Sequence, residues 1–276
     1  MKLIGMISIF WLFIVLVYGT SDFSAWGDPE SPCNLHVSNY YIEHAMSDTS
    51  VPNIVTAILA DYRGFDTMFE TAVIFSAGIA CFFLLRRPKY DAPEAVVFRH
   101  IQTGITLRIE KGGRLPKESD EFERIDTQWV PYDLVIQATS RILVPFIQLF
   151  ALYVVAHGHH SPGGGFQGGV IFGAAIILFA VSNTLRKTTH RVSEKRSAVL
   201  CAIGVLIYAG TGVCCLLAGG NFLDYSALSG LLGVDPVTAR SHGIMMVEMG
   251  VGLAVTMVMI WIYYNLSSAG KQHEGL

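Results

Sequence analysis

Apolar residues are gathered into six blocks, and this pattern limits the chain to one fold class. Of the 276 residues, 52% are hydrophobic and 15% are charged, whereas a soluble domain has about 25% charged residues. A helix needs about 20 residues to cross a bilayer, and each block approaches that length. We therefore predict an all-α, polytopic membrane protein with about six transmembrane helices. The predicted spans are residues 3–19, 67–85, 132–156, 169–185, 198–219 and 243–266.

The basic residues between these blocks are distributed unevenly. Residues 20–66 contain seven acids and one base, whereas residues 86–130 contain nine bases and residues 186–196 contain five. Cytoplasmic loops are enriched in Lys and Arg, so we predict that the two basic segments lie in the cytoplasm. Both termini of this cell-membrane protein are then cytoplasmic, and residues 157–168 and 220–241 lie outside with residues 20–66.

The first block has a second interpretation, because it also has features of a signal peptide. It begins with Lys2 and has a short apolar core, but no A-x-A cleavage site follows. The five cysteines form no C-x-x-C pair or disulfide framework. The net charge of -3 gives no sign of nucleic-acid binding.

A charged segment divides the chain into two membrane modules. It contains LRIEKGGRLPKESDEFERID, with a Gly-Gly turn and no spanning block. We predict a two-span module at residues 1–90, a charged cytoplasmic linker at 91–130 and a four-span domain at 131–276. The linker is either a solvated connection or a docking surface for a cytoplasmic partner.

Residues 51–75 predict a helix that is interrupted near the membrane surface. The apolar run Ile54–Ala60 is too short to cross, and Asp61, Arg63 and Asp66 follow it. Such a break is tolerated where it is buried in protein or faces water. Alternatively, the segment lies at the interface, with Arg63 paired to Asp61 or Asp66.

The stretch HGHHSPGGGFQGG, residues 157–169, allows three interpretations. A phosphate-binding loop would end in G-K-[ST], which is absent. The histidines could bind a metal, even as part of a metal-dependent hydrolase, but the stretch contains no Cys or carboxylate ligand beside them. A tight turn at membrane level fits better, since Pro162 ends the preceding helix and the glycines allow unusual backbone angles.

Glycines continue beyond this turn. Gly165, Gly169 and Gly173 recur at every fourth residue, which gives the returning helix a flat face for close helix packing. We expect this stretch to be metal-free and to shape the backbone. The predicted structural residues of the turn are Pro162, Gly163, Gly164, Gly165, Gly168 and Gly169.

Two segments resemble known membrane subunits. PFIQLFALYVVAHGHHSPGGGFQGGVIFGAAI and HGIMMVEMGVGLAVTMVMIWIYYNL closely resemble the MnhB/MrpB family, the B-type subunits of Mrp-type cation/proton antiporters, and this resemblance runs from Asp133 to Asn265. NIVTAILADYRGFDTMFETAVIF is similar to the C-terminal region of the large MrpA protein and to the small membrane subunit of membrane-bound hydrogenases. The chain looks like a fusion of the two.

The resemblance implies a subunit without catalysis of its own and without a cofactor. Its expected partners are the lipid bilayer and the other membrane subunits of an Mrp-type antiporter, in which proton movement is coupled to movement of sodium or another cation. The alternative is a structural subunit in the membrane arm of a membrane-bound hydrogenase or a related complex I-like respiratory assembly.

Ionisable residues within the predicted spans are candidates for function. Glu70 and Glu248 both fall in the outer half of the membrane, whereas Asp133 lies near the inner surface. Arg141 is expected to neutralise a carboxylate, to line a polar cavity or to join two helices. These charges either conduct protons or cations or hold a scaffold together. The candidates for an ion or proton path are Glu70, Glu248, Arg141, His157, His159, Asp61, Arg63 and Asp66.

Overall fold

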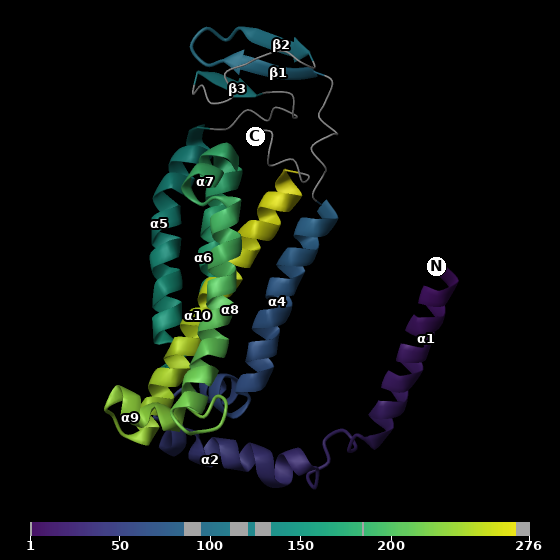
Figure 1. Cartoon of the computed structure of the whole chain (residues 1–276), viewed down its shortest axis with the longest axis vertical. Coiled ribbons are helices and arrows are strands. Elements are labelled where there is room, and N and C mark those ends of the chain that lie inside the picture. Colours follow the sequence, from purple (N-terminus) through teal and green to yellow (C-terminus); the bar gives the residue numbers. More distant parts are fainter. Residues whose placement is uncertain (1, 86–94, 111–120, 125–133, 184, 269–276) are drawn as a thin grey trace. The chain divides into compact units, whose positions relative to one another are not determined.

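Six helices of the computed structural model are long and apolar enough to cross a membrane (Figure 1). The structure describes residues 2–85, 95–110, 121–124, 134–183 and 185–268. The prediction of an all-α, multi-pass membrane protein is therefore confirmed. The six helices are α1 (Lys2–Gly19), α4 (Gly64–Leu85), α5 (Leu134–His157), α6 (Gly165–Ser182), α8 (Glu194–Leu217) and α10 (Pro236–Ser267).

Four of these helices, α4, α6, α8 and α10, begin several residues before the predicted spans. α10 begins at Pro236, where the side chain of Asp235 accepts a hydrogen bond from the backbone N–H of Thr238. α8 begins after Ser193, which caps it in the same way through Arg196. Hydropathy marks only the apolar part of a helix, whereas the helix itself begins at its cap and includes the polar first turns.

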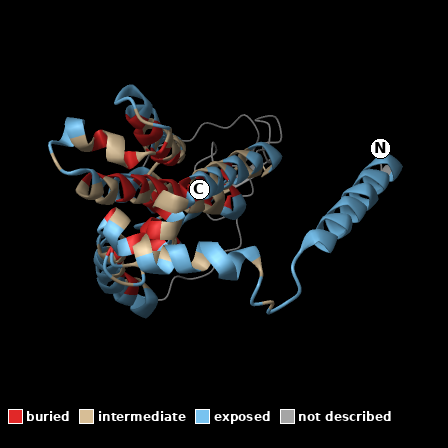
Figure 2. Cartoon of the chain, turned by 90° about the horizontal axis from the view of Figure 1, so that it is seen from below, coloured by how far each residue is buried: buried red, intermediate tan, exposed pale blue. Residues whose placement is uncertain are grey.

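The chain divides into two compact units, residues 1–45 and 46–276. The first unit contains α1, a 3-10 turn at Thr20–Asp22, a π-helical turn at Cys33–Val37 and the start of α2 (Ser38–Thr49). Every residue of Leu3–Gly19 is exposed in the isolated chain (Figure 2). An apolar helix of this length is suited to contact with lipid or with another membrane helix.

α10 is the central helix of the second unit. It packs against α4, α6 and α8, and its buried residues include Ile244, Val247 and Val255. Small residues allow the closest of these contacts: a Cβ added at Gly169 would lie 2.7 Å from the carbonyl oxygen of Gly252. Membrane helices associate through such close van der Waals packing, because lipid removes the hydrophobic force between them.

Short elements connect the long helices. α3 (Ile54–Ala57) and a π-helical turn at Ile58–Tyr62 precede α4. α7 (Leu185–Arg191) lies between α6 and α8, while a 3-10 turn at Tyr225–Leu228 and α9 (Ser229–Leu232) lie between α8 and α10.

The charged segment contains a small antiparallel sheet that was not predicted from the sequence. Its strands are β1 (Ala95–His100), β2 (Thr106–Glu110) and β3 (Phe122–Arg124), in the order β2-β1-β3. Ala95 pairs with Glu110, and Phe98 pairs with both Leu107 and Arg124. Residues 91–94, 111–120 and 125–130 of the predicted linker lie outside the described part of the chain.

Candidate functional site

The interrupted helix predicted before the second span is present. The side chain of Asn53 caps α3 by accepting a hydrogen bond from the backbone N–H of Val55. α3 runs into the π-helical turn Ile58–Tyr62, and Arg63, with φ -118° and ψ 32°, separates this turn from α4. A break of this kind exposes backbone carbonyl groups that need partners in a membrane.

Two buried tyrosines supply those partners. Tyr208 of α8 donates to the carbonyl of Gly64 at 2.8 Å, and Tyr225 donates to the carbonyl of Ala60 at 2.9 Å. Burial raises the pKa of Tyr225, so its hydroxyl stays a neutral donor. The break is therefore held inside protein, which is one of the two arrangements that the sequence left open.

The same segment is hydrogen-bonded to the glycine-rich turn. Asn53 Nδ2 donates to the carbonyl oxygens of Gly158 at 2.7 Å and Ser161 at 2.8 Å. The backbone N–H of Asn53 donates to the carbonyl of His159 at 3.0 Å, and Thr56 Oγ1 donates to that of Gly158 at 2.9 Å. Segments about a hundred residues apart thus fix each other's backbone.

Two arginine–carboxylate pairs surround the break. Arg240 at the start of α10 donates to both carboxylate oxygens of Asp61, from Nε at 2.7 Å and from Nη2 at 2.9 Å. Arg63 pairs with Asp66, its Nε lying 2.7 Å from Oδ2. The predicted pairing of Arg63 with Asp66 is present, whereas Asp61 pairs with Arg240 instead. Burial raises the pKa of Asp61, and the hydrogen bonds from Arg240 act against that rise.

The glycine-rich turn packs closely on both sides. Gly164 has φ +127° and ψ 179°, a region occupied almost only by glycine. A Cβ at this position would lie 2.8 Å from Oε1 of Glu248, and one at Gly163 would lie 2.7 Å from the carbonyl oxygen of Val154. Gly165 lies directly against the backbone carbonyl of Glu248. The turn thus brings the start of α6 against α10.

His159 and Glu248 face each other beneath this turn. Nδ1 of His159 lies 3.5 Å from Oε2 of Glu248, and the two side chains are only 6% and 12% exposed. Nε2 of His159 lies 3.0 Å from the carbonyl oxygen of Ser241. The Glu248 carboxylate raises the pKa of His159, whereas desolvation acts in the opposite direction.

A partly open cavity of about 270 Å³ lies between α3, α4, α6, α8 and α10. Its lining includes the carboxylates of Glu70 and Glu248, together with one amide, one phenol and three hydroxyl groups. The uncharged polar residues are Thr56, Thr67, Thr71, Gln167 and Tyr208. The cavity therefore offers oxygen ligands and exchangeable protons inside an apolar bundle.

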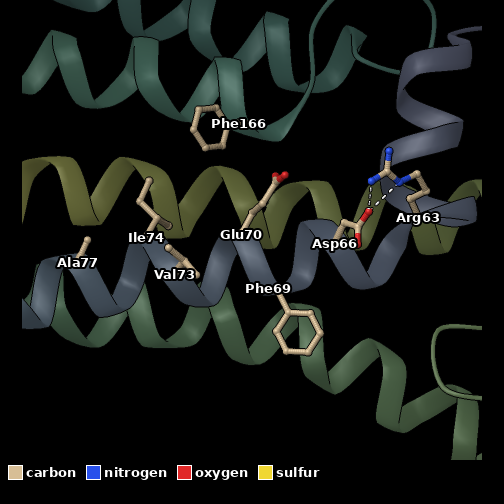
Figure 3. Close-up of a pocket in the computed structure, with 8 residues that line it drawn as sticks. All are labelled: Arg63, Asp66, Phe69, Glu70, Val73, Ile74, Ala77 and Phe166. Carbon is tan, nitrogen blue, oxygen red and sulfur yellow. Dashed lines mark hydrogen bonds and ion pairs between the residues drawn. The ribbon is translucent and has the colours of Figure 1, made fainter. Parts of the chain in front are cut away.

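A second, more open hollow of about 740 Å³ lies on the other side of Glu70. Phe69, Val73, Ile74, Ala77 and Phe166 form its apolar lining, and Arg63 and Asp66 lie at one end (Figure 3). Glu70 is exposed in the isolated chain. Glu70 thus lines the 270 Å³ cavity and is also exposed on the outer surface of the bundle.

The remaining predicted path residues lie elsewhere. The ring of His157 stacks on Tyr153 with centroids 4.8 Å apart, and His157 does not line the cavity. Arg141 is exposed on α5 and forms no ion pair with a carboxylate of the described residues, so the expected neutralising role is not seen there. Asp133 lies outside the described residues. No three His, Cys, Asp or Glu side chains gather as metal ligands in the described part of the chain.

Four residues that build the site were not predicted from the sequence: Asn53, Tyr208, Tyr225 and Arg240. Arg240 carried a usable signal, because it is a base within residues 220–241, which are predicted to lie outside, where Lys and Arg are scarce. The tyrosines and Asn53 carried no comparable signal, since their partners are backbone carbonyls distant in sequence.

These helices and buried polar contacts define a multi-pass membrane protein with a polar cavity in its bundle. Residues 135–261 match the family described as a domain related to the MnhB subunit of Na+/H+ antiporter, and residues 14–102 match MbhE, the E-type subunit of MBH. The chain thus carries an MnhB-related domain and an MbhE-related region on the same polypeptide, as the resemblance predicted.

Relatives and solved structures agree with this assignment. A probable K+/H+ antiporter A/B-type subunit of Rhizobium meliloti (strain 1021) is 30% identical over 194 residues, which are 69% of this chain and 18% of that protein. The chain thus spans less than a fifth of this relative. A chain of the membrane-bound sulfane sulfur reductase, an archaeal respiratory complex, is 25% identical with a TM-score of 0.58, covering 96% of this chain and 97% of its own. A chain of the Mrp complex from Dietzia sp. DQ12-45-1b is 25% identical with a TM-score of 0.59, covering 96% of this chain and 26% of its own.

Proposed function

We propose that the chain is a non-catalytic membrane subunit of a cation/proton antiporter-type complex, and that the 270 Å³ cavity is part of the proton or cation path. One observation carries this proposal: Glu70 from the MbhE-related region and Glu248 from the MnhB-related region line the same cavity. A polar site assembled from both regions explains why the two occur together. Its partners are then the other membrane subunits of the complex.

The chemistry of the cavity suits such a path. Intramembrane carboxylates are costly and are found where protons or cations move. Two carboxylates that line one small space can both serve as ligands for a cation. Hydroxyl and amide oxygens beside them are ligands for hard cations. The cell membrane, with both termini in the cytoplasm, is the location that fits this role and the basic loops.

A second candidate function is structural support in a respiratory membrane arm. The likeness to the sulfane sulfur reductase chain favours it, because it covers nearly all of both chains. In that case the Asp61–Arg240 pair and the tyrosine contacts hold two modules together, and the cavity carboxylates move no protons.

Replacement of each cavity carboxylate separates these functions. We would express the complex with Glu70→Gln or Glu248→Gln, together with Glu43→Gln as a control on an exposed residue. Complex assembly is measured by gel filtration, and cation-driven proton movement is measured in vesicles. The path requires that assembled Glu70→Gln and Glu248→Gln complexes lose most of this movement while Glu43→Gln keeps it. If both cavity variants retain full cation-driven proton movement across a range of pH, the two carboxylates have only a structural role.

A further inference from the structure

The facing atoms of His159 and Glu248 lack hydrogen-bond partners. Nδ1 of His159 and Oε2 of Glu248 are both buried, and neither makes a hydrogen bond within the described structure. They lie 3.5 Å from each other, just beyond hydrogen-bond distance. Buried polar groups are rarely left in this state without a functional reason.

The other nitrogen of His159 determines what can lie between these two atoms. Nε2 is 3.0 Å from the carbonyl oxygen of Ser241, which only accepts hydrogen bonds, so Nε2 carries a hydrogen. Nδ1 is therefore the nitrogen that gains or loses a proton. With one proton present, the pair is either an imidazolium facing a carboxylate or a neutral imidazole facing a carboxylic acid. Both forms can make a hydrogen bond.

Without that proton, two lone pairs would face each other across a buried contact. The Glu248 carboxylate would then be an unpaired charge on a side chain that is only 12% exposed, which is strongly unfavourable. The described lining of the cavity includes Glu248 but no Lys, Arg or His that could take the place of the proton. A mobile cation that enters the cavity could do so. His159 is not part of this lining and is connected to the cavity through Glu248.

We propose that His159 and Glu248 together hold one proton, and that this proton is released when a monovalent cation binds in the cavity beside Glu248. This proposal rests on the proposed function and names the residues at which proton and cation compete. In the step, the bond between the proton and Nδ1, or Oε2, breaks, and the proton passes to the solution through cavity water, either directly or by way of Glu70. His159 remains neutral, and the Glu248 carboxylate takes the cation as a ligand. The bound cation thus replaces the proton as the positive charge beside Glu248.

Most other ionisable groups around His159 and Glu248 are already paired and take no part in this exchange. Glu70 of α4 and Tyr208 of α8 are the other ionisable groups in the cavity lining. Asp61 and Arg240 are paired with each other, as are Arg63 and Asp66. Of the histidines near the turn and on α10, His157 stacks on Tyr153, and among the described residues His159 alone lies within ion-pair distance of Glu248. The remaining carboxylate, Glu70, is the natural acceptor or donor.

The N-terminus of α6 gives a further reason why a proton and a cation compete at Glu248. Oε1 of Glu248 lies beside Gly164, where an added Cβ would be 2.8 Å from it. The positive end of an 18-residue helix stabilises a nearby carboxylate. The deprotonated form of Glu248 is thus supported on one side and needs a cation on the other.

Proton release can be measured without transport. The purified intact complex in weakly buffered solution receives NaCl or KCl, with choline chloride as the ionic-strength control, and a pH indicator reports released protons. We expect the wild-type complex to release a proton on addition of Na+ or K+ but not choline. His159→Gln and Glu248→Gln should abolish this release, whereas His160→Gln, an exposed residue of the same turn, should retain it. Release by His159→Gln equal to that of the wild type would overturn the proposal.

A second measurement covers the case in which His159→Gln fails to assemble. Infrared difference spectra of the wild-type complex, recorded on addition of the same salts, should show loss of an imidazolium or a protonated carboxyl signal. Spectra without either loss would contradict the proposal. If the Glu70 variant loses transport while these spectra show no loss, the shared-proton proposal fails and the proposed function stands. If transport persists in both carboxylate variants, the proposed function fails instead.

Discussion

Arg240 and Asp61, 179 residues apart in sequence, form an ion pair with two hydrogen bonds of 2.7 and 2.9 Å. The guanidinium is also placed over the ring of Tyr62, 5.7 Å from its centroid. The pair joins the π-helical turn before α4 to the first turns of α10. It therefore connects the MbhE-related and MnhB-related parts of the chain where the cavity is built.

Removal of one member of this pair should destabilise the protein strongly. Arg240→Gln leaves the Asp61 carboxylate, only 9% exposed, without a countercharge, and breaking a buried pair costs about 3–5 kcal/mol. We expect a lower melting temperature and little assembled complex. Arg240→Lys should restore only part of the stability, because an ammonium cannot make the two-point contact. The double variant Asp61→Asn/Arg240→Gln should be more stable than Arg240→Gln alone, and equal instability would show that the pairing does not matter.

Asn53 should contribute more to stability than a surface asparagine. Asn53→Ala removes the donor to the carbonyl oxygens of Gly158 and Ser161. Gly158 keeps the hydrogen bond from Thr56, whereas the Ser161 carbonyl loses its donor, and an unsatisfied buried group costs about 1–3 kcal/mol. Asn34→Ala removes one hydrogen bond on an exposed side chain and is the matched control. Thermal unfolding should place the melting temperature of Asn53→Ala well below that of Asn34→Ala. Similar values would mean that the turn does not depend on the broken helix.

A side chain at Gly164 should prevent the turn from forming. Gly164→Val introduces a β-branched residue at φ +127°, which costs about 1–3 kcal/mol for backbone strain alone, and its Cβ would contact Glu248. We expect poor assembly of the complex. Gly210→Val on α8 is the control, because a Cβ there meets no atom within 4 Å. If Gly164→Val assembled normally and lost only transport, the turn would have a ligand-binding role instead of a structural one.

The sequence predicted the helices because membrane spans are set by local composition. Each apolar block had to become a helix, since only helices satisfy their own backbone in lipid. The positions of helix starts were less accurate, as α10 begins at Pro236 rather than near residue 243. The small sheet of β1, β2 and β3 was missed because its strands are short and lie in a charged segment.

The site was only partly predictable. Glu70 and Glu248 were expected in the same half of the membrane because each lies a known number of residues from a helix end. Their shared cavity depends on helix packing, and the partner of Asp61 depends on a contact with Arg240 far along the chain. Charges three or four residues apart can pair on a helix, and this spacing correctly predicted the Arg63–Asp66 pair. It cannot detect contacts between residues far apart in the sequence.

Labelling of introduced cysteines should establish the orientation of α8. In a background in which the native cysteines are replaced by serine, Asn221→Cys and Lys195→Cys place single thiols at exposed positions near opposite ends of α8. The basic segment 186–196 predicts that a membrane-impermeant thiol reagent labels Asn221→Cys, but not Lys195→Cys, in intact cells. Both should react after permeabilisation. Labelling of only Lys195→Cys in intact cells would reverse the topology.

The His159–Glu248 pair should give the protein a pH-dependent stability. Because Glu248 raises the pKa of His159, the folded protein holds this proton more tightly than the unfolded chain, in which a histidine has a pKa of about 6.5. The stabilisation is therefore complete below about pH 6.5 and declines as the pH rises through the higher folded pKa.

The measurement is the difference in melting temperature between the wild type and His159→Gln. This difference should be largest in mildly acidic buffer and should shrink as the pH is raised through neutrality into the alkaline range. His160→Gln changes the same residue type at an exposed position and should show no such trend. A difference for His159→Gln that stays constant or grows with pH would mean that the histidine is held neutral, with Nδ1 serving only as an acceptor.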